Sequence, residues 1–81
     1  MRVTVRLFAR ARDLVGKGEI VRNVREGATI RDVWQDLVAE YPVLVPYTHT
    51  VSCARNLEYA RMNVQVADGD EIAFLPPVSG G

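Results

Sequence analysis

The strongest constraint on the fold is one amphipathic segment over residues 29–41. Apolar side chains recur there at the i, i+3, i+4, i+7, i+8 and i+11 spacing that forms a single stripe along an α-helix. The stripe consists of Ile30, Val33, Trp34, Leu37, Val38 and Tyr41. Thr29 and Asp32 form a capping-box pattern at its start, with Asp in place of the usual Glu or Gln, and Pro42 ends it. A helix with one apolar stripe must bury that stripe against a second layer.

The start of the chain supplies the first part of that layer. Residues 2–7 alternate polar and apolar side chains, which predicts a half-buried strand with Val3, Val5 and Leu7 on its inner face. The alternation then stops, and residues 9–15 contain good helix formers followed by a glycine. We therefore expect a strand and a short helix.

Strands and connecting segments make up the rest of the chain. Residues 42–50 are apolar but irregular and include a proline inside the segment, which predicts a packed loop with one helical turn. Further strands are predicted at 19–24, 51–55 and 71–75, with a turn and a short extended piece over 56–61. The second strand runs antiparallel to the first, and Arg22 or its neighbours point outward. This order predicts an α+β fold of the β-grasp type, with a mixed sheet packed on one main helix.

Composition excludes several classes of site. The 81 residues include one cysteine and one histidine, too few for an internal disulfide or a structural zinc site, so no metal ligand is predicted. Ten basic and ten acidic residues cancel, which argues against binding to nucleic acid or membrane by net charge. Residues 1–25 nevertheless carry seven basic side chains against two acidic ones, so one face is expected to be basic.

No targeting or membrane segment is recognisable. No apolar run approaches the ~20 residues of a membrane helix, and the N-terminus starts directly in a strand pattern rather than a signal peptide. We therefore expect a cytoplasmic protein with a single domain over residues 1–77, without nucleic-acid or membrane partners.

The end of the chain is the most informative motif. A Pro-Pro pair at 76–77 follows the strand predicted at 71–75 and favours an extended path. Residues 78–81, Val-Ser-Gly-Gly, are then predicted to form a flexible tail outside the domain. Because glycine lacks a Cβ, Gly80 and Gly81 can thread a narrow channel and deliver the terminal carboxyl into another protein's active site.

With these motifs the chain resembles the small sulfur-carrier subunits of molybdopterin synthase, a family of ubiquitin-like proteins. The resemblance covers the whole chain and is most specific in residues 7–16 (LFARARDLVG) and 68–81 (DGDEIAFLPPVSGG). Related thiamine-pathway carriers share the fold and the Gly-Gly ending but usually lack the Pro-Pro before it. Two features depart from the family pattern: Arg55-Asn56 stands where Val-Asn is frequent, and the 42–50 loop is longer and more apolar than expected.

The resemblance implies that the chain is a sulfur-donating reagent, with the catalytic groups in its partners. A ubiquitin-activating-like adenylyltransferase would use ATP to adenylate the Gly81 carboxylate, and a sulfur donor would replace AMP to give a thiocarboxylate. The tail would then enter the large synthase subunit, where the sulfur passes to a pyranopterin precursor. No cofactor is expected to be bound by the chain itself. Adenylation is needed because a carboxylate is a poor electrophile without a good leaving group.

Several side chains are predicted to contact these partners. Phe8 and Leu75 fall on the outward parity of their strands, so both are predicted off the core face unless they pack under the helix at 9–15. Tyr59 stands where the family carries a docking hydrophobe. Arg12 matches an arginine that pairs with acids on the activating enzyme, the alternative being a solvated helix charge. The predicted partner-binding set is Phe8, Arg12, Tyr59, Leu75, Pro76, Pro77, Val78 and Ser79.

Other residues are predicted to be structural, and other functions stay open. Cys53 is expected to be a small buried hydrophobe, and Trp34 a core residue whose indole N–H needs a partner. The chain could instead donate sulfur to thiamine, cysteine or tRNA, or be a ubiquitin-like modifier conjugated to lysines. A binding module without tail chemistry is a third class, which deletion of Gly80 and Gly81 without loss of function would support.

Overall fold

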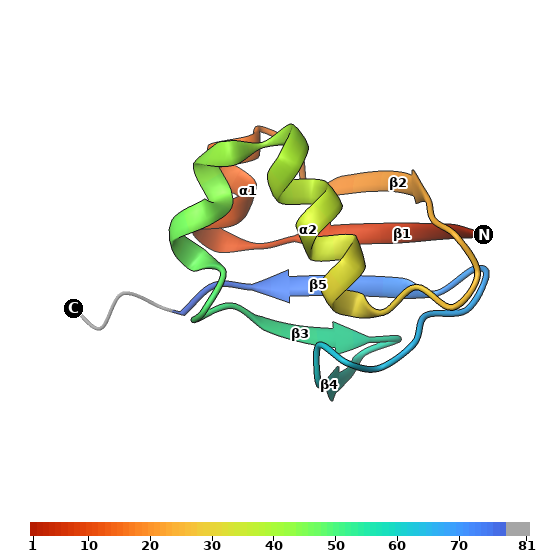
Figure 1. Cartoon of the computed structure of the whole chain (residues 1–81). Helices are drawn as coiled ribbons and strands as arrows, with labels where there is room; N and C mark the ends of the chain where they lie inside the picture. The colour runs from red at the N-terminus through yellow and green to blue at the C-terminus, as the bar shows by residue number, and fades with distance from the viewer. Residues whose placement is uncertain (78–81) are drawn as a thin grey trace.

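Residues 1–77, the part of the chain that the structure describes, form a five-stranded sheet crossed on one face by a helix (Figure 1). The structure is a computed structural model. Its elements in chain order are β1 (Arg2–Leu7), α1 (Ala9–Val15), β2 (Glu19–Asn23), α2 (Ile30–Glu40), the 3-10 helix η1 (Pro42–Tyr47), β3 (Ser52–Arg55), β4 (Glu58–Ala60) and β5 (Glu71–Leu75).

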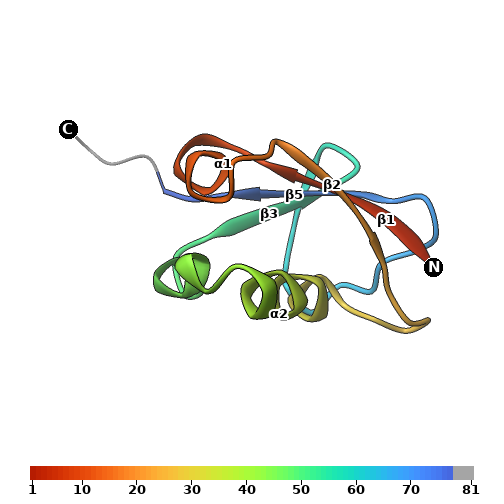
Figure 2. The same cartoon turned by 90° about the horizontal axis from the view of Figure 1, so that it is seen from above.

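The sheet is mixed, with strand order β2-β1-β5-β3-β4. β1 and β5 pair in parallel, and the other neighbouring strands pair antiparallel. Figure 2 shows α2 lying against one face of this sheet. The predicted α+β arrangement, a mixed sheet packed on one main helix, is therefore confirmed. The bounds of the predicted strands agree with the observed ones to within one residue.

The capping box at the start of α2 is formed as predicted. The Thr29 hydroxyl accepts a hydrogen bond from the Asp32 N–H at 3.3 Å, and the Asp32 carboxylate accepts one from the Thr29 N–H at 2.9 Å. Two of the free donors at the helix start are satisfied in this way. The helix ends at Glu40, immediately before η1 begins at Pro42.

The core lies between α2 and the inner face of the sheet. Val5, Ile72 and Phe74 are completely buried there. The rings of Trp34 and Phe74 pack at a tilt of 57° with their centroids 4.9 Å apart. The indole N–H of Trp34 donates a hydrogen bond to the Thr48 hydroxyl at 3.2 Å. Trp34 is thus a core residue with a satisfied N–H, as predicted.

Charged side chains connect β2 to α2 at the edge of the core. Arg22 is half-buried on the helix-facing side of β2, where its guanidinium binds the carboxylates of Asp36 and Glu40. Val21 and Asn23 are exposed, so the outward positions of this strand are the neighbours of Arg22 and not Arg22 itself. The arginine stem covers apolar surface while its charged head meets the acids of α2.

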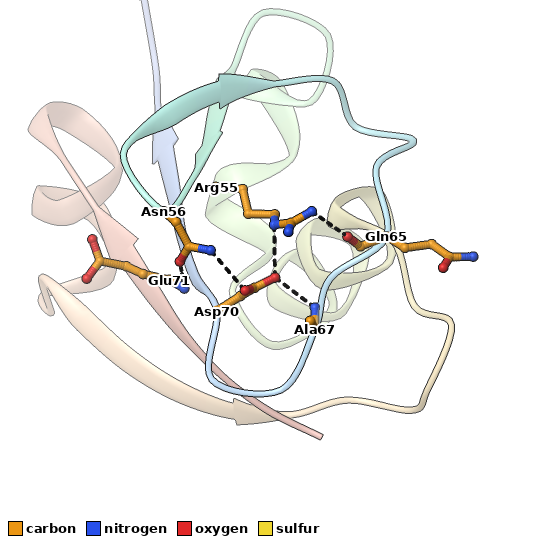
Figure 3. A network of polar contacts seen from close by, with 6 residues as sticks. All are labelled: Arg55, Asn56, Gln65, Ala67, Asp70 and Glu71. Atoms are coloured by element: carbon orange, nitrogen blue, oxygen red, sulfur yellow. Dashed lines mark hydrogen bonds and ion pairs between the residues drawn. The ribbon is translucent and has the colours of Figure 1, made fainter.

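A polar network joins the β3–β4 hairpin to the turn before β5 (Figure 3). The buried Asp70 carboxylate accepts hydrogen bonds from the Asn56 amide at 2.9 Å and the Ala67 N–H at 2.7 Å. Its charged neighbour is Arg55, whose Nε lies 3.1 Å from the Asp70 Oδ2. Burial alone would raise the pKa of Asp70, but the hydrogen bonds and the guanidinium outweigh it and hold the pKa below the ordinary value.

We expect Asp70→Ala to lower the free energy of unfolding by about 2 kcal/mol at neutral pH, because Arg55 and Asn56 lose their acceptor. A carboxyl with a depressed folded-state pKa stabilises the fold above its unfolded-state pKa. That contribution disappears as the pH falls through the folded-state value. The difference between wild type and variant should therefore shrink below about pH 4.

Urea unfolding at neutral and acidic pH measures this effect. Asp13→Ala is the matched control, because Asp13 is an exposed carboxylate on α1, and its removal should change stability by less than about 0.5 kcal/mol. A wild-type advantage over Asp70→Ala that stays constant down to the lowest pH would contradict the assigned role of the charge.

Candidate docking surface and carrier tail

The base of the tail follows the middle strand of the sheet. β5 lies between β1 and β3, and it is followed by Pro76, which is buried, and Pro77, which is exposed. The remaining predicted site residues lie outside the described residues: Val78, Ser79, Gly80 and Gly81. The described part of the chain therefore places only the base of the tail.

Three predicted docking residues share the outer face of the sheet, the face opposite α2. Phe8 is 40% exposed and Tyr59 80% exposed, while Leu75 is half-buried. None of the three is buried under α1, which was the alternative for Phe8 and Leu75. The strand register places the small side chains of Ala54 and Ala73 in adjoining positions of this face. The result is a shallow apolar surface suited to contact with a protein.

A fourth apolar residue of this surface escapes sequence reasoning. Leu57 stands at the tip of the two-residue hairpin between Arg55 and Glu58 and is 90% exposed. Its φ of 72° lies in the left-handed region, as does that of Asn56 at 51°, and leucine is unfavourable there. A strained backbone that holds an apolar side chain in solvent indicates a functional role. The sequence does not show this feature, because it depends on the length of the turn between the paired strands. Below, the outer patch means Phe8, Leu57, Tyr59 and Leu75.

Arg6 provides the polar centre beside the outer patch. Its guanidinium lies 3.9 Å from Glu19 and 3.8 Å from Glu71, and 5.9 Å from the centre of the Phe8 ring. Leu57 and Arg6 also line a common surface hollow. Because exposed ion pairs contribute little to stability, they can exchange partners when another protein binds.

Arg12 projects from α1 close to Phe8. Both residues line one surface hollow of about 380 Å³, and Arg12 also lies against Gly18. Arg12 is exposed and makes no ion pair within residues 1–77. Among the described residues Arg10 and Lys17 likewise make no ion pair, whereas Arg22 binds acids of α2. The side chain of Arg2 in β1 also makes no ion pair within residues 1–77, so the unpaired basic side chains of residues 1–25 lie around α1 and at the start of β1.

The remaining reactive side chain, Cys53, is structural. It is buried on β3, and its thiol donates a hydrogen bond to the Ala60 carbonyl at 3.1 Å. Burial raises the pKa of the thiol, which disfavours the nucleophilic thiolate. Within residues 1–77, no group of three His, Cys, Asp or Glu side chains is arranged to hold a metal ion. The same residues contain no helix that is long and apolar enough to cross a membrane.

Comparisons with known proteins agree with this geometry. The model of the ThiS family matches residues 5–81. The chain is 36% identical to the molybdopterin synthase sulfur carrier subunit of Chlamydomonas reinhardtii, over 100% of both chains. It is 32% identical to small archaeal modifier protein 3 of Haloferax volcanii, also over 100% of both.

Solved structures show the same fold. The crystal structure of SAMP1 from Haloferax volcanii superposes with a TM-score of 0.86 at 30% identity, covering 100% of both chains. The predicted ubiquitin-like β-grasp fold and the predicted resemblance are both confirmed. The chain therefore belongs to the ThiS family, as one of the small ubiquitin-like proteins that include the sulfur carrier subunits of molybdopterin synthase.

Proposed function

We propose that this protein is the sulfur carrier of molybdenum cofactor biosynthesis. The observation that carries the proposal is the Pro-Pro-Val-Ser-Gly-Gly ending, which directly follows the central strand β5 in a chain related over its full length to such carriers. The working atom is then in the terminal carboxyl of Gly81, and the domain serves to present it.

Other proteins convert the Gly81 carboxylate to a thiocarboxylate in two steps. An adenylyltransferase transfers AMP from ATP to the Gly81 carboxylate and releases pyrophosphate, and sulfide-level sulfur from a donor then displaces AMP to leave a thiocarboxylate. The thiocarboxylate is a good nucleophile at neutral pH, and its attachment to a docked protein gives it a high effective concentration. Its sulfur bonds to a pyranopterin precursor in the large synthase subunit, and water then cleaves the acyl–sulfur bond and returns the Gly81 carboxylate. The chain is not an enzyme on its own and needs no bound cofactor.

The surface of the domain supports docking of these partners. Interface cores are rich in aromatic side chains and arginine, and the outer patch with its neighbours Arg6 and Arg12 has this composition. Pro77 extends the exposed surface towards the tail. Both the activating enzyme and the large subunit take up the same carboxyl terminus, so both must approach this end of the sheet. All of these steps belong to the cytoplasm.

An intact-mass measurement tests the proposal directly. The purified protein is incubated with ATP, a sulfur source and the activating enzyme of its own organism. We expect a mass increase equal to the replacement of one oxygen by sulfur, located at Gly81 by fragmentation. Omission of ATP is the control, because without the adenylate no leaving group exists. If an active enzyme leaves the mass of the protein unchanged, the proposal that it is a sulfur carrier is wrong.

Conjugation to lysines is the second candidate, favoured by the 32% identity to a small archaeal modifier protein. It would use the same adenylate, but the final nucleophile would be a lysine amine. Cellular proteins with a lysine amine joined to the Gly81 carboxyl by an isopeptide bond would support it. The same mass experiment separates the two, because a modifier that transfers directly from the adenylate forms no thiocarboxylate.

A further inference from the structure

The 3-10 helix η1 has apolar side chains that lie outside the core and are exposed. Val43 and Val45 are 45% and 53% exposed, whereas Leu44 between them is fully buried. Residues 42–50 contain no Asp, Glu, Lys or Arg. The two exposed valines, one residue apart in an uncharged segment, form a small apolar area that is available for contact with another protein.

η1 is held firmly in place. Its N–H and carbonyl groups bond locally, with Thr48 N–H to the Val45 carbonyl at 3.1 Å and Val51 N–H to the Tyr47 carbonyl at 2.8 Å. The hydrogen bond from the Trp34 indole to Thr48 ties its end to α2. Because the segment is already ordered, little conformational entropy is lost when its valines contact another surface.

η1 lies at the end of the molecule where the described chain ends. Ser52, just after the η1 segment, pairs with Leu75 at the end of β5. Figures 1 and 2 both show the green segment after α2 at the same end as α1 and the end of β5. This end therefore carries the valines of η1, the arginines of α1 and the base of the tail.

The reach of the tail brings a partner to this end. Four residues follow Pro77, and four residues span at most about 14 Å. A protein that encloses the Gly81 carboxyl must therefore lie within about 14 Å of Pro77. A standard interface covers about 800 Å² on each partner, which corresponds to a patch roughly 16 Å in radius. Ser52 pairs with Leu75, and the Val51 N–H bonds to the Tyr47 carbonyl at the end of η1, so a patch of that size centred at the tail base reaches η1.

We propose that Val43 and Val45 form part of the binding surface for the large synthase subunit. This inference rests on the proposed function. Interfaces between stably associated subunits are more apolar and poorer in charge than those of brief encounters, and η1 is uncharged and apolar. The basic side chains of α1, by contrast, suit the brief encounter with an activating enzyme, where charge mainly accelerates association. Both partners approach the same end, and the valines of η1 add to the contact with the large subunit while the arginines of α1 add to the contact with the activating enzyme.

The test compares the double variant Val43→Ser/Val45→Ser with wild type. Calorimetric titration with the large subunit should show a dissociation constant about 10-fold to 100-fold higher for the variant, because two valines lose their burial. Thiocarboxylate formation by the activating enzyme should change less than about twofold. Val21→Ser is the matched control, since Val21 is 54% exposed but lies on the edge strand β2.

The outcomes separate this inference from the proposed function. Equal affinities of wild type and double variant for the large subunit would overturn the inference alone. An equal loss in both assays, with an unchanged unfolding curve, would overturn the assignment to the large subunit. A wild-type protein that gains no sulfur and does not bind the large subunit would overturn the proposed function, and the inference with it.

Discussion

A protein extended by one alanine after Gly81 is expected to form no detectable thiocarboxylate, a loss of at least about 1,000-fold in rate. The added residue moves the carboxyl by about 3.5 Å along the tail and places a methyl group where the last glycine has none. A misplacement of 1 Å in an active site can already cost about 100-fold. The intact-mass assay with ATP, sulfur source and activating enzyme measures the effect.

The fold should not respond to this extension, because the added residue lies beyond the described domain. An unchanged urea unfolding curve is therefore the control that separates lost chemistry from lost structure. Sulfur transfer to the extended protein at the wild-type rate would show that the position of the carboxyl is irrelevant. In that case the chain would still carry sulfur, but the proposed requirement for a terminal glycine at position 81 would be wrong.

Local periodicity explains why most of the fold is predictable. The apolar stripe of residues 29–41 and the alternation of residues 2–7 each report which side of an element is buried, and the structure buries those sides. The capping box and the turn residues then mark where the elements end. These signals are contained within short segments, so no knowledge of the rest of the chain is required.

Features that depend on distant residues are not predictable in this way. Arg55 departs from the Val-Asn pair that is frequent in the family, and the structure shows that Arg55 and Asn56 both bind Asp70, fourteen and more residues away. Arg22 likewise lies inward because acids on α2 accept it. Both arrangements pair charged groups across elements, and sequence alone gives no register for such pairs.

The candidate site divides along the same line. The Gly-Gly tail and its Pro-Pro base are contiguous, so the sequence alone points to them, and the outward parity of Phe8 and Leu75 follows from strand alternation. Leu57 could not be found this way, because its exposure depends on a two-residue turn whose length becomes visible only in the paired strands. The grouping of η1 with the tail base depends on the pairing of Ser52 with Leu75, which is also non-local.

The largest expected loss of stability comes from Trp34→Ala. Trp34 is 1% exposed, packs against Phe74 and holds the end of η1 through Thr48, so its removal opens a cavity between α2 and β5. Truncation of a buried tryptophan costs about 3–5 kcal/mol. A domain of this size has a total stability of roughly 4–12 kcal/mol, so the variant should be close to unfolding at room temperature.

Thr48→Val separates the packing of Trp34 from its hydrogen bond. Valine keeps the shape of threonine but cannot accept the indole N–H, and we expect a loss of about 1 kcal/mol, well below that of Trp34→Ala. Urea unfolding followed by circular dichroism measures both variants, since the tryptophan fluorescence is lost in one of them. If Trp34→Ala cost no more than Thr48→Val, the indole ring would be a helix-surface group anchored by one hydrogen bond. The packing of Trp34 against Phe74 would then not be what holds η1 in its position.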